Sequence, residues 1–418
     1  MTAIPTSLIR SAEAALERIL AMAHPADGVL SRYFREHPGL GARDRAFIAE
    51  TVFGALRRFR LLEAGGARRP RELLLGYLAR CDGRNLRELE PLSARERDLL
   101  GALKSLRSED LPAGVRAELP DWLAERLTAA FGEAEMVAIG RGMQDSAPLD
   151  LRVNALKADR DAVIARLRAD GFECEPTPLS PVGIRLAEKP AINRHPLFLE
   201  GAIEVQDEGS QLLGFLLAPR RGEMVVDFCA GAGGKTLQLG AMMRSLGRLY
   251  AFDVSNRRIA QLKPRLARSG LSNVHPQRIE SESDARVRRL AGKVDRVLVD
   301  APCTGTGTLR RNPDLKWRQS PASVAELSAK QRAILDAAAR LPKAGGRLVY
   351  ATCSLLREEN EDVVEGFLAA HPGYTVAPAG EVLESAGIRV EAGRYLRLFP
   401  HRHGTDGFFA AVLTRSAP

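Results

Sequence analysis

The sequence predicts an α/β protein built from three parts, and three observations support this prediction. From residue 222 to about 415, short apolar runs alternate with amphipathic segments, which is typical of a parallel sheet covered by helices on both faces. Residues 1 to about 140 carry apolar side chains at helical spacing with few strand-like alternations. The intervening stretch mixes short strands with a helix. We therefore expect a helical domain over 1–140, a small α/β module over 148–220 and a larger α/β domain over 221–418.

The N-terminal domain is expected to consist of helices separated by turns rich in Pro and Gly. Helical spacing is found in five stretches, at 11–21, 42–58, 68–78, 94–106 and 119–131. The whole chain has a formal net charge of +9, and a polyanionic partner would explain it, because phosphate contacts come mainly from Arg and Lys. A bias of the genome towards arginine codons is the alternative explanation. We expect these residues to form a separate helical domain with a basic face. The alternative is that they form a lid over the rest of the protein.

The two following parts are expected to contain these elements. In the small module, the strands are 149–154, 172–175, 183–187 and 202–206, with helices at 159–169 and 210–217. In the last domain, the strands are 224–228, 248–253, 274–279, 294–300, 346–351, 395–399 and 407–413, and the main helices are 235–245, 255–269, 321–341 and 358–370. Ligands of open α/β sheets bind at the carboxyl ends of the strands, so the residues after each strand are the candidates for a site.

A glycine-rich turn, "VVDFCAGAGGKT" at 225–236, follows the first of these strands. It fails the phosphate-loop pattern G-x-x-x-x-G-K-[ST] at its first position, where Cys229 replaces glycine, and a dinucleotide fingerprint would need glycine at Thr236. Asp253 lies twenty residues after Gly233, where an acidic residue accepts hydrogen bonds from a ribose diol. The pattern therefore favours an adenosine-type ligand. A phosphate-loop NTPase, and a helix-capping role for Asp253, remain the alternatives.

Two cysteines follow two further strands. Cys303 stands in "VDAPCTGTG" and Cys353 in "ATCS", so both are expected at the sheet edge that carries the glycine turn. The five cysteines form no C-x-x-C pair, which indicates a reducing cytoplasm and argues against a disulfide. No further Cys or His has zinc-like spacing beside them, so no metal is expected. Two cysteines in one cleft favour chemistry over structural burial, although burial is the usual fate of a single cysteine.

Three motifs in this order, "DFCAGAGGKT", "VDAPCTGTGTLRRNPDLKW" and "ATCSLLREENEDVVEGFL", resemble those of the RNA cytosine-5 methyltransferases of the RsmB/NSUN superfamily, over about 148–415. The N-terminal stretch "RDRAFIAETVFGALRR" is similar to the NusB-like RNA-binding domain of bacterial members. The resemblance implies a class I, Rossmann-like methyltransferase domain, an RRM-like small module, and S-adenosylmethionine as the methyl donor. It implies formation of 5-methylcytosine, with 16S rRNA or a small-subunit assembly intermediate as partner. Transfer RNA or 23S rRNA as substrate, or a non-catalytic ribosome-assembly factor, are the alternatives. We expect a cytoplasmic monomer with no membrane association.

The resemblance also assigns roles to individual residues. Cys353 is the nucleophile that attacks carbon 6 of cytosine, Cys303 takes part in its release, and Asp300 lies where donor and base meet. Asp253 is expected to bind the ribose of the donor and Glu280 the adenine side. The methionine part is expected to contact Cys229, Ala230, Gly231, Ala232, Gly233, Gly234 and Lys235.

This sequence departs from the family pattern at two of these positions. Ala232 replaces the usual proline, and Glu280 replaces an aspartate, with other acids at 282 and 284 nearby. The basic stretch 310–317 that follows Cys303 is expected to position RNA phosphates, and a solvated loop is its alternative.

Overall fold

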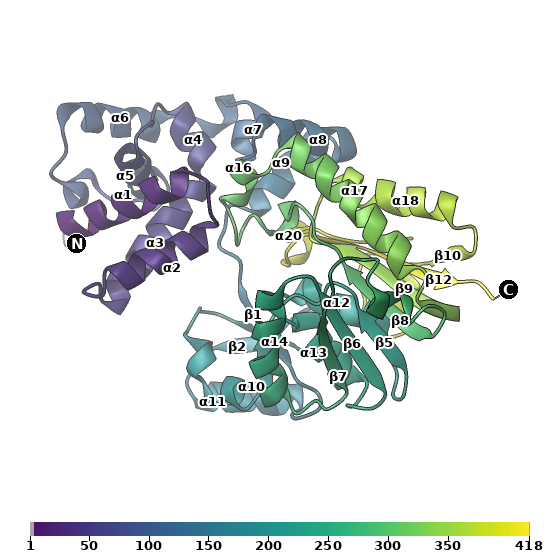
Figure 1. Cartoon of the computed structure of the whole chain (residues 1–418). Helices are drawn as coiled ribbons and strands as arrows, with labels where there is room; N and C mark the ends of the chain where they lie inside the picture. The colour runs from purple at the N-terminus through teal and green to yellow at the C-terminus, as the bar shows by residue number, and fades with distance from the viewer. Residues whose placement is uncertain (1–3, 418) are drawn as a thin grey trace. The chain divides into compact units, whose positions relative to one another are not determined.

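The computed structural model describes residues 4–417 (Figure 1). The chain divides into two compact units. The first contains Met1–Ser146 and a second segment, Thr308–Pro321; the other contains Ala147–Gly307 and Ala322–Pro418. The chain thus leaves the second unit directly after the Cys303 loop, contributes a short segment to the first, and returns.

The first unit is helical, as the spacing predicts. Its helices are α1 (Thr6–Leu20), α2 (Ala26–Glu36), α3 (Ala42–Arg57), α4 (Phe59–Ala64), α5 (Pro70–Arg80), α6 (Ala94–Ser105), α7 (Ala113–Arg116), α8 (Asp121–Phe131) and α9 (Glu133–Gly142), with α16 (Leu315–Arg318) from the second segment. Helix α6 begins at a capping box formed by Ser93 and Glu96, and α5 begins with Pro70 at its first position. The sequence did not predict α2, α4, α7, α9 and α16.

The second unit begins with a small antiparallel sheet in the order β2-β3-β1-β4. Its strands are β1 (Leu149–Val153), β2 (Cys174–Pro176), β3 (Gly183–Leu186) and β4 (Ile203–Val205), packed on α10 (Arg160–Ala169). Every predicted strand of this module is present within one or two residues. Helix α12 (Glu208–Leu217) then leads into the larger sheet.

The larger sheet has the order β10-β12-β9-β8-β5-β6-β7, with β11 paired to β12. Its strands are β5 (Met224–Asp227), β6 (Arg248–Asp253), β7 (Val274–Arg278), β8 (Val294–Asp300), β9 (Pro342–Thr352), β10 (Tyr374–Ala377), β11 (Leu396–Leu398) and β12 (Phe408–Arg415). Strands β5 to β9 pair in parallel, whereas β12 runs antiparallel to β9. The expected parallel sheet is therefore confirmed over β5 to β9. Strand β10 was not predicted.

Helices cover both faces of this sheet, because its central strands are apolar on both sides. Along β5, Val225 packs into one core with leucines of α12 and of α13 (Gly234–Met242). The next residue, Val226, packs into the opposite core with α17 (Pro321–Ala338) and α18 (Glu361–Ala370). This double coverage leaves the strand ends as the place for a site.

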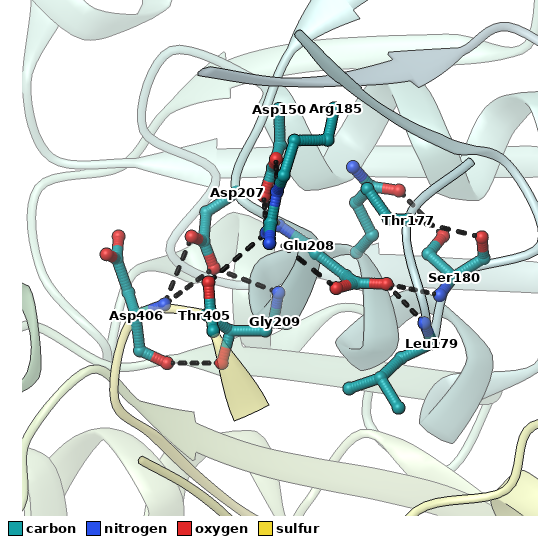
Figure 2. Close-up of polar contacts among 12 residues, drawn as sticks. Asp150, Thr177, Leu179, Ser180, Arg185, Asp207, Glu208, Gly209, Thr405 and Asp406 are labelled. Atoms are coloured by element: carbon teal, nitrogen blue, oxygen red, sulfur yellow. Dashed lines mark hydrogen bonds and ion pairs between the residues drawn. The ribbon is translucent and has the colours of Figure 1, made fainter. Parts of the chain in front are cut away.

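A buried charged network fixes the small sheet to the rest of the second unit (Figure 2). Arg185 of β3 makes a bidentate ion pair with Asp150 of β1, at 2.7 Å from Nε to Oδ1 and 2.9 Å from Nη2 to Oδ2. Arg185 also donates to the carbonyl of Gly404, and Asp207 accepts the backbone N–H of Asp406. Removing one partner of such a buried pair costs about 3–5 kcal/mol, because the other charge stays buried. The loop 404–407 before β12 is therefore held firmly by the small sheet.

Candidate active site

A cavity of about 600 Å³ opens at the carboxyl ends of β5, β6, β8 and β9. The polar and sulfur-containing side chains that line it include Asp227, Cys229, Lys235, Asp253, Glu282, Asp300, Cys303, Lys330 and Cys353. The structure thus brings both predicted cysteines, Asp300, Asp253 and the glycine loop to one site. Of the loop residues 229–235, all but Gly233 line the cavity.

The glycine loop follows β5 and ends as the first turn of α13. Gly231 and Gly233 have positive φ angles of 57° and 86°, in the left-handed region that favours glycine. A Cβ on Gly233 would lie 2.0 Å from Leu262, so this residue serves close packing behind the loop. The carbonyl of Ala232 accepts a hydrogen bond from Arg265 at 2.7 Å, and that of Gly234 accepts one from Arg152 at 2.6 Å. These two arginines hold the loop at Ala232 and at Gly234.

Asp253, at the end of β6, is held by two backbone donors. Its Oδ2 accepts the N–H of Gly231 at 2.9 Å, and its Oδ1 accepts the N–H of Ser255 at 2.7 Å. The N-cap of α14 (Asn256–Ser269) is Ser255, whose hydroxyl accepts the N–H of Arg258. Ser255, and not Asp253, therefore caps helix α14. Asp253 instead ties the glycine loop to the next strand, with spare acceptor capacity on each carboxylate oxygen.

Asp227, which the sequence did not mark as a site residue, is buried at the floor of the cavity. Its Oδ2 accepts the hydroxyl of Thr236 at 2.6 Å, whereas Oδ1 has no hydrogen-bond partner within residues 4–417. Burial raises the pKa of this carboxyl to about 7. A buried acceptor without a partner is costly, so a ligand group that donates a hydrogen bond or carries positive charge would be stabilised here.

Lys235 and Asp300 form an ion pair, with Nζ 2.6 Å from Oδ2. Burial alone would lower the pKa of Lys235, but the charge and the hydrogen bond of Asp300 outweigh burial and raise it. Lys235 therefore stays protonated at neutral pH and offsets the charge of Asp300. The pair stands between the glycine loop, which carries Lys235, and the Cys303 loop, which begins after Asp300.

The sulfur atoms of Cys303 and Cys353 lie 3.4 Å apart, and both are free thiols. The hydrogen bond with Cys353 and burial raise the pKa of Cys303 well above its ordinary value. Cys303 thus stays protonated at neutral pH, and either sulfur can donate the hydrogen bond between them.

Two sequence-based assignments are not supported by the structure. Glu280 lies outside the lining of the cavity; it is exposed and pairs with Arg278 at 3.1 Å, whereas Glu282 lines the cavity. The reason is local, because Ile279 continues the sheet edge inward and the next side chain turns to solvent. The sequence alone does not show which of the three acids Glu280, Glu282 and Asp284 faces the cavity.

The basic stretch after Cys303 is the other correction. Lys316 is only 4% exposed, and its Nζ donates to the carbonyls of Glu118 at 2.7 Å and Arg57 at 3.1 Å. Trp317 packs on Phe59 with ring centroids 5.1 Å apart. The stretch is therefore not a simple solvated loop. Lys316 belongs to the interior of the first unit, where two backbone carbonyls accept its hydrogen bonds.

Other described side chains bear on what the site can bind. Within residues 4–417, no three His, Cys, Asp or Glu side chains gather as metal ligands. No helix in this described part of the chain is long and apolar enough to cross a membrane. Glu282, one of the neighbouring acids that the sequence offers, lines the cavity, and so does Lys330 of α17, which no sequence motif marks.

The comparisons with known proteins decide the family. The model of the 16S rRNA methyltransferase RsmB/F matches residues 214–414, and the ferredoxin-like domain of RsmF/B-like methyltransferases matches 119–193. A probable ribosomal RNA small subunit methyltransferase B of Synechocystis is 33% identical over 93% of this chain and 95% of its own length. The chain belongs to the 16S rRNA methyltransferase RsmB/F family. The expected family, methyltransferase activity and S-adenosylmethionine as donor are thereby confirmed.

Further relatives agree with membership of the RsmB/F family. A probable small subunit methyltransferase B of Bacillus subtilis is 33% identical over 75% of this chain and 73% of its own length. A crystal structure of a methyltransferase homolog from Pyrococcus horikoshii matches 74% of this chain and all of its own, with 30% identity and a TM-score of 0.62. NSun6 of the same organism, solved with SFG, has 21% identity and a TM-score of 0.63 and so shares the fold. The class I fold is confirmed, and the phosphate-loop alternative has no support among these RsmB/F relatives.

Proposed function

We propose that this protein methylates carbon 5 of a cytosine in 16S rRNA through a covalent bond between Cys353 and carbon 6 of the base. The observation that carries the proposal is the pair of sulfur atoms, 3.4 Å apart, in the cavity that also contains the Lys235–Asp300 ion pair. Relatives named small subunit methyltransferase B, at 33–37% identity, support the choice of 16S rRNA or a small-subunit assembly intermediate. Cytoplasmic location and a monomeric state belong to the same proposal.

The residues of the cavity fit S-adenosylmethionine. The cavity, of about 600 Å³, is large enough for a nucleoside with an amino-acid arm. Asp253 would accept hydrogen bonds from the ribose, and the unpartnered Oδ1 of Asp227 suits a positively charged group of the amino-acid arm. Glu282, rather than Glu280, is the acid on the expected adenine side. When bound, the donor supplies a methyl group activated by its sulfonium charge.

The cysteines supply the covalent chemistry. Carbon 5 of cytosine is a poor nucleophile, and addition of the Cys353 sulfur to carbon 6 converts the ring into an enamine that is a better one. Electron density that the ring gains at nitrogen 3 and at the exocyclic amine would be stabilised by the Lys235–Asp300 pair. After carbon 5 is methylated, a base takes the proton from carbon 5, the double bond between carbons 5 and 6 re-forms, and the carbon–sulfur bond breaks, so that Cys353 leaves with the electron pair of that bond. Cys303, in contact with that sulfur, takes part in this release.

Two substitutions test the proposal. Replacing Cys353 by alanine should abolish both methyl transfer and any adduct, whereas Cys303→Ala should allow attack and methylation but stall release. The Cys303→Ala protein should therefore accumulate a protein–RNA adduct that resists denaturant, seen as a shifted band in denaturing gels with labelled RNA. Reversed phenotypes would exchange the two roles, and methylation by the Cys353→Ala protein would refute covalent catalysis. Bisulfite sequencing of rRNA from cells with and without the gene would identify the nucleotide.

The other parts of the chain complete the proposal. We retain the division into a NusB-like RNA-binding domain (1–140), an RRM-like module (148–220) and a catalytic domain (221–418). The helical first unit and the four-stranded small sheet are consistent with these parts. In this division, the net charge of +9 serves attraction to the RNA phosphates.

A further inference from the structure

Glu359 is a fully buried carboxylate next to the two cysteine loops. It ends the short 3-10 helix η5 (Arg357–Glu359), after the Cys353 loop, and its exposed fraction is 0%. Its Oε1 accepts the backbone N–H of Thr304 at 2.8 Å, and its Oε2 accepts the hydroxyls of Thr304 and Ser354. Thr304 directly follows Cys303, and Ser354 directly follows Cys353. One carboxylate therefore bonds to the neighbour of each reactive cysteine.

A fourth donor completes the set. The side-chain amide of Gln331, on α17, donates to Oε1 at 3.0 Å and to the carbonyl of Pro302 at 2.9 Å. Four donors thus point at the two oxygens of Glu359, which matches an ionised, acceptor-only carboxylate. A hydrogen bond to a charged group is worth more than a neutral one, and no water molecule is needed to satisfy this buried charge.

The same contacts set the geometry of the sulfur pair. Thr304 and Ser354 are also in contact with each other, with 3.3 Å between their hydroxyl oxygens. Since each residue is one peptide unit from its cysteine, fixing both to one carboxylate restrains the distance between the two cysteine backbones, and this keeps their sulfur atoms within reach of each other. The pKa of Cys303 is raised first by the hydrogen bond to Cys353 and by burial, and the negative charge of Glu359 adds to this effect.

We propose that Glu359 is a positioning residue that holds Cys303 against the Cys353 sulfur and so makes release of the methylated base efficient. This inference rests on the proposed function, because it concerns the release step of the covalent mechanism. Glu359 itself lies outside the lining of the cavity and acts through Thr304 and Ser354.

The test is Glu359→Gln in the full-length chain, with Cys303→Ala as reference and Glu361→Gln as matched control. Gln has the same shape but places an N–H₂ donor among four donors. Glu361 is a buried neighbour on the next helix, and it pairs with Arg397 at 2.7 Å rather than with either cysteine loop. We measure turnover of methylated RNA and the fraction of enzyme trapped as a denaturant-resistant adduct.

We expect Glu359→Gln to lower turnover about tenfold to 100-fold, the usual result of a small misplacement of reacting groups. The trapped fraction should rise towards that of Cys303→Ala, whereas Glu361→Gln should trap no more than the wild type. In a folded Glu359→Gln protein, a loss of product without a rise in trapped adduct would overturn the inference, as would release at the wild-type rate. Should Glu359→Gln fail to fold, Thr304→Val decides, because it removes one donor and keeps the backbone N–H; unchanged trapping in that variant would overturn the inference.

The proposed function and this inference fail in distinguishable ways. If Cys303→Ala traps no adduct although the wild type methylates RNA, the covalent mechanism is wrong and this inference falls with it. If Cys303→Ala traps adduct and Glu359→Gln does not, the mechanism stands and only the role of Glu359 is overturned.

Discussion

The glycine loop after β5 and the cysteine loop after β8 lie at the same edge of the sheet, but they are built differently. The glycine loop is shaped by two left-handed glycines of its own, and it is held by the carboxylate of Asp253 and by Arg152 and Arg265, which donate to its carbonyls. The Cys303 loop depends on distant residues. Glu359 and Gln331 fix its first part, and Gly407 lies against its end. Directly after it, the chain enters the first unit.

This difference separates the two tasks of the site. The glycines that shape the first loop lie within one short, contiguous motif, which the sequence shows directly. A pair of sulfur atoms on two different strands must be brought to contact distance by residues from elsewhere. The cofactor half and the cysteine half of the cavity should therefore be separable by mutation.

The largest effect is expected from Gly307→Ala, in the cysteine half. A Cβ at this position would lie 2.2 Å from the carbonyl oxygen of Gly407 and 2.8 Å from that of Cys353, so a backbone must move. The same backbone segments are joined by hydrogen bonds, from Gly307 N–H to Cys353 O and from Gly407 N–H to Gly307 O, both 2.8 Å. We expect methyl transfer to fall by about 100-fold or more, while the affinity for S-adenosylmethionine, measured by calorimetry, stays near that of the wild type.

Gly366→Ala is the control for that substitution, because a Cβ at Gly366 on α18 meets open space. This substitution should leave both methyl transfer and the affinity for S-adenosylmethionine unchanged. Should Gly307→Ala lose donor binding together with methyl transfer, the two halves of the cavity are coupled and the comparison fails.

The same difference explains how far the sequence predicts this protein. In the cofactor half, the sequence predicts strand β5, the glycine turn, helix α13 and strand β6, because glycine conformation and strand ends are local properties. Asp300 and the two cysteines were found by motif, and the parallel strands explain why they meet. Glu359 lies inside the third motif, but the sequence does not distinguish it from Glu358 and Glu361, since its importance comes from burial that only the packed fold creates.

Local sequence is also a poor guide where tertiary packing decides whether a side chain is buried or reaches the cavity. The acid at 280 follows the right strand, but only the side chain at 282 reaches the cavity. The charged stretch containing Lys316 and Asp314 has the composition of an exposed loop, yet both side chains are buried within the first unit. Tertiary contacts with Arg57 and Glu118 satisfy that ammonium group, and residues so far apart in the chain leave no local pattern.

An intermediate effect, confined to the cofactor half, is expected from Asp253→Asn. The new amide places a donor against one of the two N–H groups that the carboxylate accepts, and it weakens acceptance from a ribose. We expect the Kd for S-adenosylmethionine to rise about tenfold, whereas the rate at which iodoacetamide alkylates Cys353 stays unchanged. Asp295→Asn is the matched control, because Asp295 also accepts a backbone N–H, from Met224, but does not line the cavity. If Asp253→Asn bound S-adenosylmethionine with wild-type affinity, the proposal that Asp253 binds the ribose would be wrong.

The smallest effect on methyl transfer is expected from Lys316→Met, which tests the segment after the cysteine loop. Burial lowers the pKa of Lys316 to about 8, against an ordinary value of 10.5. Below pH 8 the lysine is protonated in both the folded and the unfolded chain. Between about 8 and 10.5 the unfolded chain keeps a proton that the folded chain has lost, so the free energy of unfolding rises with pH in this window. The rise is at most about 1.4 kcal/mol for each pH unit, and it is absent in Lys316→Met.

Denaturant titrations of both proteins at pH 8, 9 and 10 measure this difference, and other titrating groups cancel in the comparison. The wild type should gain stability relative to Lys316→Met as the pH rises; a constant difference would mean that the ammonium is not buried in solution. The affinity for RNA discriminates independently, because loss of one phosphate contact lowers the slope of log K against log salt by about 1. We expect an unchanged slope, since the Lys316 ammonium donates to two backbone carbonyls and is only 4% exposed. A reduced slope would instead indicate that Lys316 contacts an RNA phosphate, as the composition of the segment suggests.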